Sequence, residues 1–145
     1  MIDTRTAPYA ALLLRVSLGA LLLAHGLLLK VFTFGIAGTA GYFESIGYPA
    51  LFAYLVIAGE ILGGIALILG VWTRWVALLA VPILIGATLQ HVPNGWLFSA
   101  AQGGWEFPAF WTVALLVQAL LGDGAHALLP SRASAPSASA VAGAR

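Results

Sequence analysis

Long apolar runs separated by short polar stretches dominate the chain. The runs lie at about residues 8–30, 49–71, 74–91 and 106–122. A helix rises about 1.5 Å per residue, so about 20 apolar residues cross a hydrocarbon core about 30 Å thick. The runs are apolar on every face and do not alternate in polarity, which argues against transmembrane β-strands. The pattern therefore predicts an all-α polytopic membrane protein, a four-transmembrane-helix bundle.

The same pattern divides the chain into two parts. Residues 1–130 hold all four apolar runs and are expected to form one transmembrane domain. Residues 131–145 are a low-complexity stretch rich in Ala and Ser, which predicts a disordered tail. Arg15 interrupts the first run and no small-residue cleavage site closes it, so we expect a retained helix, not a cleaved signal peptide.

Composition narrows the class of protein further. Hydrophobic residues make up 61% of the chain and charged residues 8%, against about 25% charged residues in soluble domains. A chain with so few charges is neither disordered, nor a nucleic-acid binder, nor an ordinary cytosolic enzyme. It contains no cysteine, so disulfides, thiolate metal sites and thiol redox chemistry by the chain itself are excluded.

The distribution of cationic residues predicts an orientation in the membrane. With four spans, the two termini and the second loop share one side, which holds Arg5, Arg74, Arg132 and Arg145, whereas the other side holds only Lys30. Because positive residues favour the cytoplasmic side, both termini are expected inside the cell.

Ionisable residues inside apolar helices are costly and mark candidate functional sites. Counted from the ends of their runs, Arg15 and Glu60 fall at similar depths near the middle of the membrane. This arithmetic predicts a core ion pair between Arg15 and Glu60. The pair could be purely structural and fix the register of two helices, or it could belong to a proton or substrate path.

A second polar group falls near the predicted outer face. It comprises His25, Lys30, Gln90, His91 and Glu106. These residues predict a pocket for a polar head such as a quinone ring. In that hypothesis His25, His91 and Glu106 exchange protons as the catalytic residues, and Lys30 and Gln90 bind the substrate. The alternative is that each histidine simply lies at the interface and caps its own helix. Haem ligation by the two histidines is less favoured, and no local metal-ligand spacing is present, so no metal site is predicted.

The order and spacing of several short motifs resemble the DoxX family of small four-helix bacterial membrane proteins. The matching stretches run over about residues 10–125 and include Arg15-Val-Ser-Leu-Gly19, His25-Gly26-Leu-Leu-Leu-Lys30, Phe43 to Pro49, Glu60-Ile-Leu-Gly-Gly64, His91 and Gly103-Gly104-Trp105-Glu106. The resemblance implies a quinone-linked or redox-associated role in the bacterial cytoplasmic (inner) membrane. If the chain takes part in catalysis, it would do so as a membrane oxidoreductase subunit.

Two other functions remain open on the sequence. The chain could be a non-catalytic membrane scaffold that anchors a soluble oxidant-detoxifying complex, as the resemblance to some DoxX members implies. It could also be a small dimeric transporter that uses Glu60. The expected partners are the lipid bilayer, soluble redox proteins and a second copy of the chain, with no nucleic acid. The sequence leaves the cofactor unknown, with a quinone as the candidate and haem less favoured.

Overall fold

The computed structural model describes residues 3–131, and over this range the all-α prediction is confirmed. Val71 and Leu129 form an isolated β-bridge, and the described residues contain no strand. The order of the elements is α1 (Ala7–Leu23), η1 (Ala24–Thr33), α2 (Ile36–Ser45), α3 (Ala50–Leu69), α4 (Thr73–His91), η2 (Val92–Asn94) and α5 (Glu106–Leu121).

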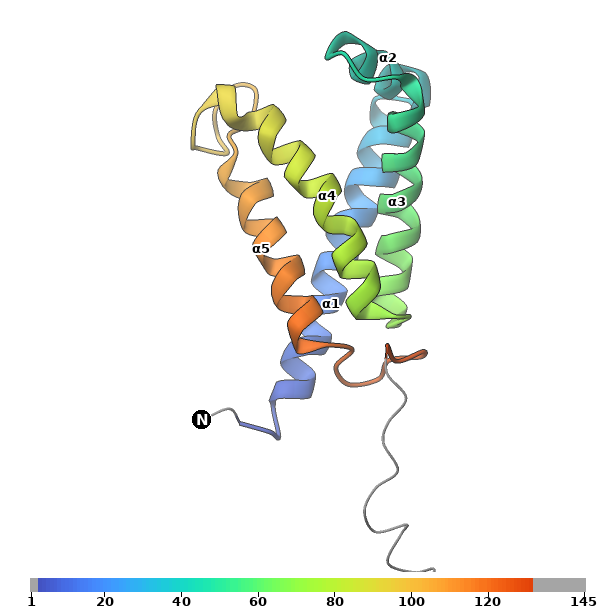
Figure 1. Cartoon of the computed structure of the whole chain (residues 1–145), viewed down its shortest axis with the longest axis vertical. Helices are drawn as coiled ribbons and strands as arrows, with labels where there is room; N and C mark the ends of the chain where they lie inside the picture. The colour runs from blue at the N-terminus through green and yellow to red at the C-terminus, as the bar shows by residue number, and fades with distance from the viewer. Residues whose placement is uncertain (1–2, 132–145) are drawn as a thin grey trace, which may run out of the picture.

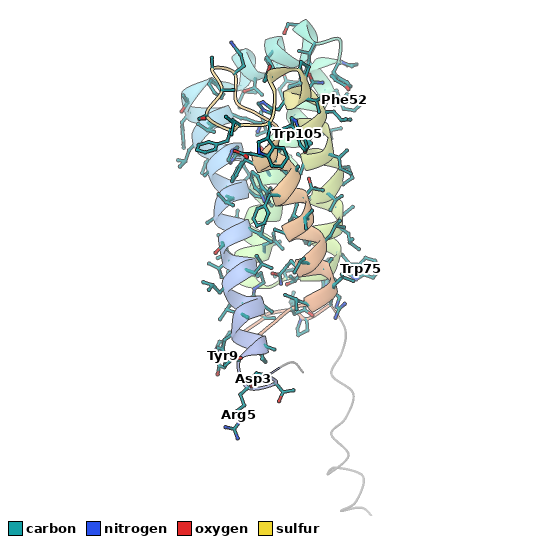
Figure 2. The ribbon with its side chains drawn as sticks, turned by 90° about the vertical axis from the view of Figure 1, so that its left-hand side faces the viewer. Asp3, Arg5, Tyr9, Phe52, Trp75 and Trp105 are labelled. Atoms are coloured by element: carbon teal, nitrogen blue, oxygen red, sulfur yellow. The ribbon has the colours of Figure 1, made fainter. Side chains whose placement is uncertain are left out.

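Three helical segments are long and apolar enough to cross a membrane. They are Ala7–Thr33, Ala50–Leu69 and Thr73–Asn94. The fourth apolar helix, α5, has 16 residues, or about 24 Å of helix, and packs along α4 (Figure 1). Labelled aromatic residues lie at both ends of the bundle, with Trp105 and Phe52 at one end and Tyr9 and Trp75 at the other (Figure 2). The four-span count and the orientation stay predictions.

The first long helix changes its hydrogen-bonding pattern halfway along. After α1, the ten residues of η1 form a π-helix, in which each N–H bonds five residues back. In an α-helix, His25 and Lys30 would point about 140° apart. The wider π-helical turn brings residues five apart much closer to one face. The π-helix therefore lets both side chains face the bundle, where Lys30 contacts Glu60 of α3 and His25 packs on Trp111 of α5.

Glycines allow α1–η1 and α3 to pack with their backbones close together. A Cβ added at Gly19 would lie 2.7 Å from the Gly64 carbonyl oxygen, and one at Gly26 would lie 2.8 Å from the Glu60 Cβ. Small residues at helix contacts are the usual means of close packing in membranes, where helix association depends on van der Waals contact. These contacts fix the antiparallel register, with Gly26 level with Glu60 and Gly19 level with Gly64.

The remaining helices form a second pair that joins the first through a shared core. The α4–α5 pair meets α1 and α3 closely at the end where α1 begins and diverges from them toward α2 (Figure 1). Large buried side chains of all four helices fill the contact, among them Leu22, Leu67, Leu84, Trp111 and Leu115. Helix α2, which lies between the first two predicted apolar runs, packs on η1 and α3 at the far end.

After α5, residues 122–131 form an irregular segment that crosses the end of the bundle where α1 begins. We call this segment the strap. The Ala125 N–H donates to the Pro8 carbonyl (2.9 Å), and the Leu129 N–H donates to the Gly70 carbonyl (3.1 Å). The strap therefore ties the start of α1 to the end of α3. Ser131 belongs to this ordered strap, whereas the rest of the predicted tail lies outside the described residues.

Candidate functional site

A buried ion pair joins η1 to α3 near the α2 end of the bundle. The Lys30 Nζ donates to both carboxylate oxygens of Glu60, at 2.7 and 2.8 Å. The two side chains are 19% and 6% exposed. The hydroxyl of buried Thr39 on α2 donates to the Lys30 backbone carbonyl (3.0 Å), so α2 also holds this part of η1 in place. A carboxylate and an ammonium are thereby fixed inside the apolar bundle.

His25, on the same helical segment as Lys30, packs against α5. The Leu21 carbonyl accepts a hydrogen bond from the His25 Nδ1 at 2.9 Å. Because a carbonyl only accepts, Nδ1 carries a hydrogen, and Nε2, which has no hydrogen-bond partner among the described residues, is the proton acceptor whenever the ring is neutral. The imidazole lies next to the contact with α3, because the following residue, Gly26, packs against the Glu60 Cβ. It also packs edge-on against Trp111, with ring centroids 4.9 Å apart.

Trp111 is a site residue that sequence reasoning missed. Its side chain is 3% exposed. The indole Nε1–H has no hydrogen-bond acceptor among the described residues, although a buried donor normally has one. It lies within an apolar run, and nothing in the sequence distinguished it from the other aromatic residues. Together, His25, Lys30, Glu60 and Trp111 form what we call the His25 cluster.

The predicted Arg15–Glu60 ion pair is wrong. Arg15 is 1% exposed, but its Nη2 donates to the Ala125 carbonyl of the strap (3.3 Å), and its Nη1 lies against Gly70. Gly70 is ten residues, or about 15 Å of helix, beyond Glu60. The depth arithmetic assumed that both runs began at the membrane boundary. In fact α1 begins well below the end of α3 (Figure 1), which places Arg15 level with the last turn of α3 and Lys30 within reach of Glu60.

Within residues 3–131 Arg15 forms no salt bridge. Its Nε and Nη1 have no acceptor among the described residues. Asp123 on the strap is the carboxylate whose charge acts on it. Burial raises the pKa of Asp123, but hydrogen bonds from the Ser131 hydroxyl (2.7 Å) and N–H (2.9 Å) outweigh burial and hold the pKa below its usual value. Asp123 is thus ionised at neutral pH and bound to Ser131.

His91 and Glu106 organise the loop between α4 and α5. The His91 Nδ1 donates to the Gly103 carbonyl (3.0 Å), and a Glu106 carboxylate oxygen accepts from the Phe98 N–H (2.8 Å). Within residues 3–131, no three His, Asp or Glu side chains gather closely enough to hold a metal ion. Both side chains therefore make contacts within the loop, and their shared site with His25 stays a prediction. Gln90 is half-buried beside His91 near the end of α4.

Comparisons with known proteins identify one relative and one family for this chain. The chain is 42% identical over 78 residues to the Bacillus subtilis (strain 168) protein named "Putative oxidoreductase CatD", a stretch that covers 54% of this chain and 56% of that protein. The chain thus spans little more than half the length of this relative. No solved structure matches this chain. The sequence model of the DoxX family matches residues 10–93, more than half of the chain and including Arg15, His25, Lys30, Glu60 and His91. The protein is therefore a member of the DoxX family, with the long apolar helices of a membrane protein.

Proposed function

We propose that the protein is a redox-associated membrane subunit that binds the polar head of a quinone at the His25 cluster. The observation that carries the proposal is the unpartnered, buried Nε1–H of Trp111 beside the His25 imidazole. A buried donor without an acceptor costs about 1–3 kcal/mol. A quinone carbonyl would accept this hydrogen bond and remove that cost.

The residues around Trp111 fit a head group that exchanges protons. The His25 Nε2 is free to accept or return a proton, because Nδ1 is bound to the Leu21 carbonyl. Lys30 supplies a positive charge that would favour an anionic oxygen, and Glu60 keeps that ammonium in place. Phe107, whose ring is 6.4 Å from His25 and nearly parallel to it, adds an aromatic surface. The quinone would supply the electron-accepting chemistry, and the chain would supply binding and proton transfer.

The name of the Bacillus relative supports an oxidoreductase role, since that protein is called an oxidoreductase. Membership of the DoxX family favours the same class. We place the protein in the bacterial cytoplasmic membrane, with the His25 cluster toward the outer leaflet if both termini are inside. Because the chain contains no cysteine, any thiol step would belong to a soluble redox partner.

Titration of the purified protein with a short-chain quinone, followed by tryptophan fluorescence, tests the proposal. Trp111→Phe keeps the ring but removes the donor, and we expect binding about fivefold to tenfold weaker, the loss of one hydrogen bond. His25→Ala is expected to weaken binding at least as much. His91→Ala, which alters only the loop, is the matched control and should bind as the unaltered protein does. No binding by the unaltered protein, or equal binding by all four proteins, would contradict the proposal and favour the scaffold function.

A further inference from the structure

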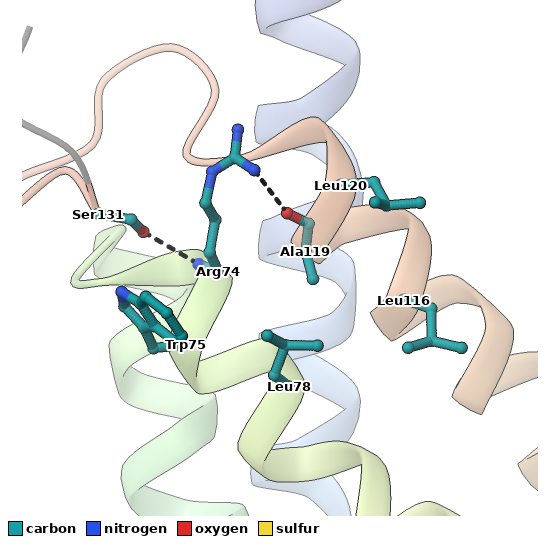
Figure 3. A pocket seen from close by; sticks show the side chains of 7 residues that line it. All are labelled: Arg74, Trp75, Leu78, Leu116, Ala119, Leu120 and Ser131. Carbon is teal, nitrogen blue, oxygen red and sulfur yellow. Dashed lines mark hydrogen bonds between the residues drawn. The ribbon is translucent and has the colours of Figure 1, made fainter.

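An apolar groove lies between α4 and α5 at the strap end, far from the His25 cluster. Its volume is about 430 Å³, and its walls are Trp75 and Leu78 of α4 and Leu116 and Leu120 of α5 (Figure 3). Leu120 is 79% exposed and Trp75 61% exposed. In a membrane these side chains face lipid, so the groove opens toward acyl chains.

A fixed positive charge stands at the mouth of the groove. The Arg74 Nη1 donates to the Ala119 carbonyl (3.0 Å), and the Arg74 N–H donates to the Ser131 hydroxyl oxygen (3.0 Å). Among residues 3–131 Arg74 has no salt-bridge partner. The nearby carboxylate of Asp123 is bound to Ser131 instead. The guanidinium is therefore held in position while its charge stays available to a ligand.

The depth of these residues matches the two parts of a phospholipid. Arg74 is the second residue of α4, whose candidate span begins at Thr73, so its charge lies at the level of the head groups. Leu78 and Leu116 lie deeper along the two helices, whereas Leu120, next to Ala119, lies near the level of Arg74 (Figure 3). Trp75 lies between these levels, as amphipathic indoles do at membrane interfaces. Cationic side chains at this depth attract anionic lipids.

We propose that the groove binds one anionic phospholipid, with its phosphate on Arg74 and an acyl chain along the leucines. The charge at the mouth selects the head group, and the apolar walls select the chain. This site would be independent of quinone binding, because it shares no residue with the His25 cluster.

Native mass spectrometry of the full chain in mild detergent tests this site. The probes are phosphatidylglycerol, phosphatidylcholine with identical acyl chains, and inorganic phosphate. We expect the protein to retain phosphatidylglycerol about fivefold better than phosphatidylcholine, the effect of one cation near an anionic head group. Arg74→Gln should abolish this preference, and Arg74→Lys should keep most of it. Arg5→Gln removes an exposed arginine outside the groove and should leave the preference unchanged.

A second variant that keeps Arg74 tests the site even if Arg74→Gln does not fold. Leu116→Trp fills the groove from the lipid-facing side of α5 and should reduce retention of both lipids while Arg74 still binds Ala119. The proposal is overturned if Arg74→Gln keeps the preference, or if Arg5→Gln lowers it equally. It is also overturned if inorganic phosphate displaces phosphatidylglycerol at similar concentrations, since the site would then bind a free anion.

Discussion

The first long helix carries two cations inside the bundle, and the structure satisfies them in opposite ways. Lys30 contacts both oxygens of a buried carboxylate, Glu60. Arg15, which is buried more completely, contacts one strap carbonyl and has Asp123 only at longer range. The Lys30–Glu60 pair is a direct ionic contact between two helices, whereas the Arg15 guanidinium makes one hydrogen bond within residues 3–131, to a backbone carbonyl. Burial of a charge within a helix therefore does not by itself identify its partner.

The largest effect on the free energy of unfolding should come from removing the Glu60 carboxylate, the partner of Lys30. Glu60→Leu leaves the Lys30 ammonium buried without a counter-charge, and we expect a loss of about 3–5 kcal/mol in the free energy of unfolding. Unfolding in mixed detergent–SDS micelles measures it. The double variant Lys30→Met with Glu60→Leu is the control, and it should recover most of the loss. If Glu60→Leu alone is neutral, the pair has no role in stability.

A second test acts on the backbone that lies against Arg15. Gly70 has a φ of +72°, and an added Cβ would collide with the Arg15 guanidinium and lie 2.7 Å from the Ala127 Cα. Gly70→Ala should therefore lower the free energy of unfolding by about 2–3 kcal/mol through backbone strain and displacement of Arg15. Gly38→Ala, where the added Cβ meets open space, is the matched control and should have little effect. A neutral Gly70→Ala variant would mean that Arg15 is easily moved.

Arg15 itself should contribute less than Glu60. Arg15→Met keeps much of the side-chain volume and removes the buried charge. It loses the hydrogen bond to Ala125 but also removes donors that have no acceptor among the described residues. We expect a loss of about 1–2 kcal/mol, measured by the same unfolding assay. A loss as large as that of Glu60→Leu would show that Arg15 has an ionic partner as strong as the Lys30–Glu60 pair.

The smallest effect should be a pH dependence at the strap. The pKa of Asp123 is lowered in the folded protein, so its ionised form stabilises the fold fully above the unfolded pKa of about 4. This contribution is lost as the pH falls through the folded pKa. Thermal unfolding between pH 6 and pH 3 should therefore show a decrease that Asp123→Asn lacks. Equal pH profiles for the two proteins would show that ionised Asp123 does not stabilise the strap.

The sequence by itself determined the class of fold and the kinds of residues that matter. Continuous apolar runs can satisfy their backbone in a membrane only as helices, and ionisable residues within such runs are too costly to be incidental. On those grounds the amino-acid order alone identifies Arg15, His25, Lys30 and Glu60 as candidate site residues.

Only the tertiary structure decided which of these residues meet. The close packing of Gly19 and Gly26 against α3 sets the register, and that register places Lys30, not Arg15, at Glu60. The π-helix turns His25 and Lys30 toward one side, and the strap supplies the contact for Arg15. Hydropathy alone does not reveal the offset start of α1, the π-helix or the strap. Each of these features depends on contacts between residues far apart in the chain.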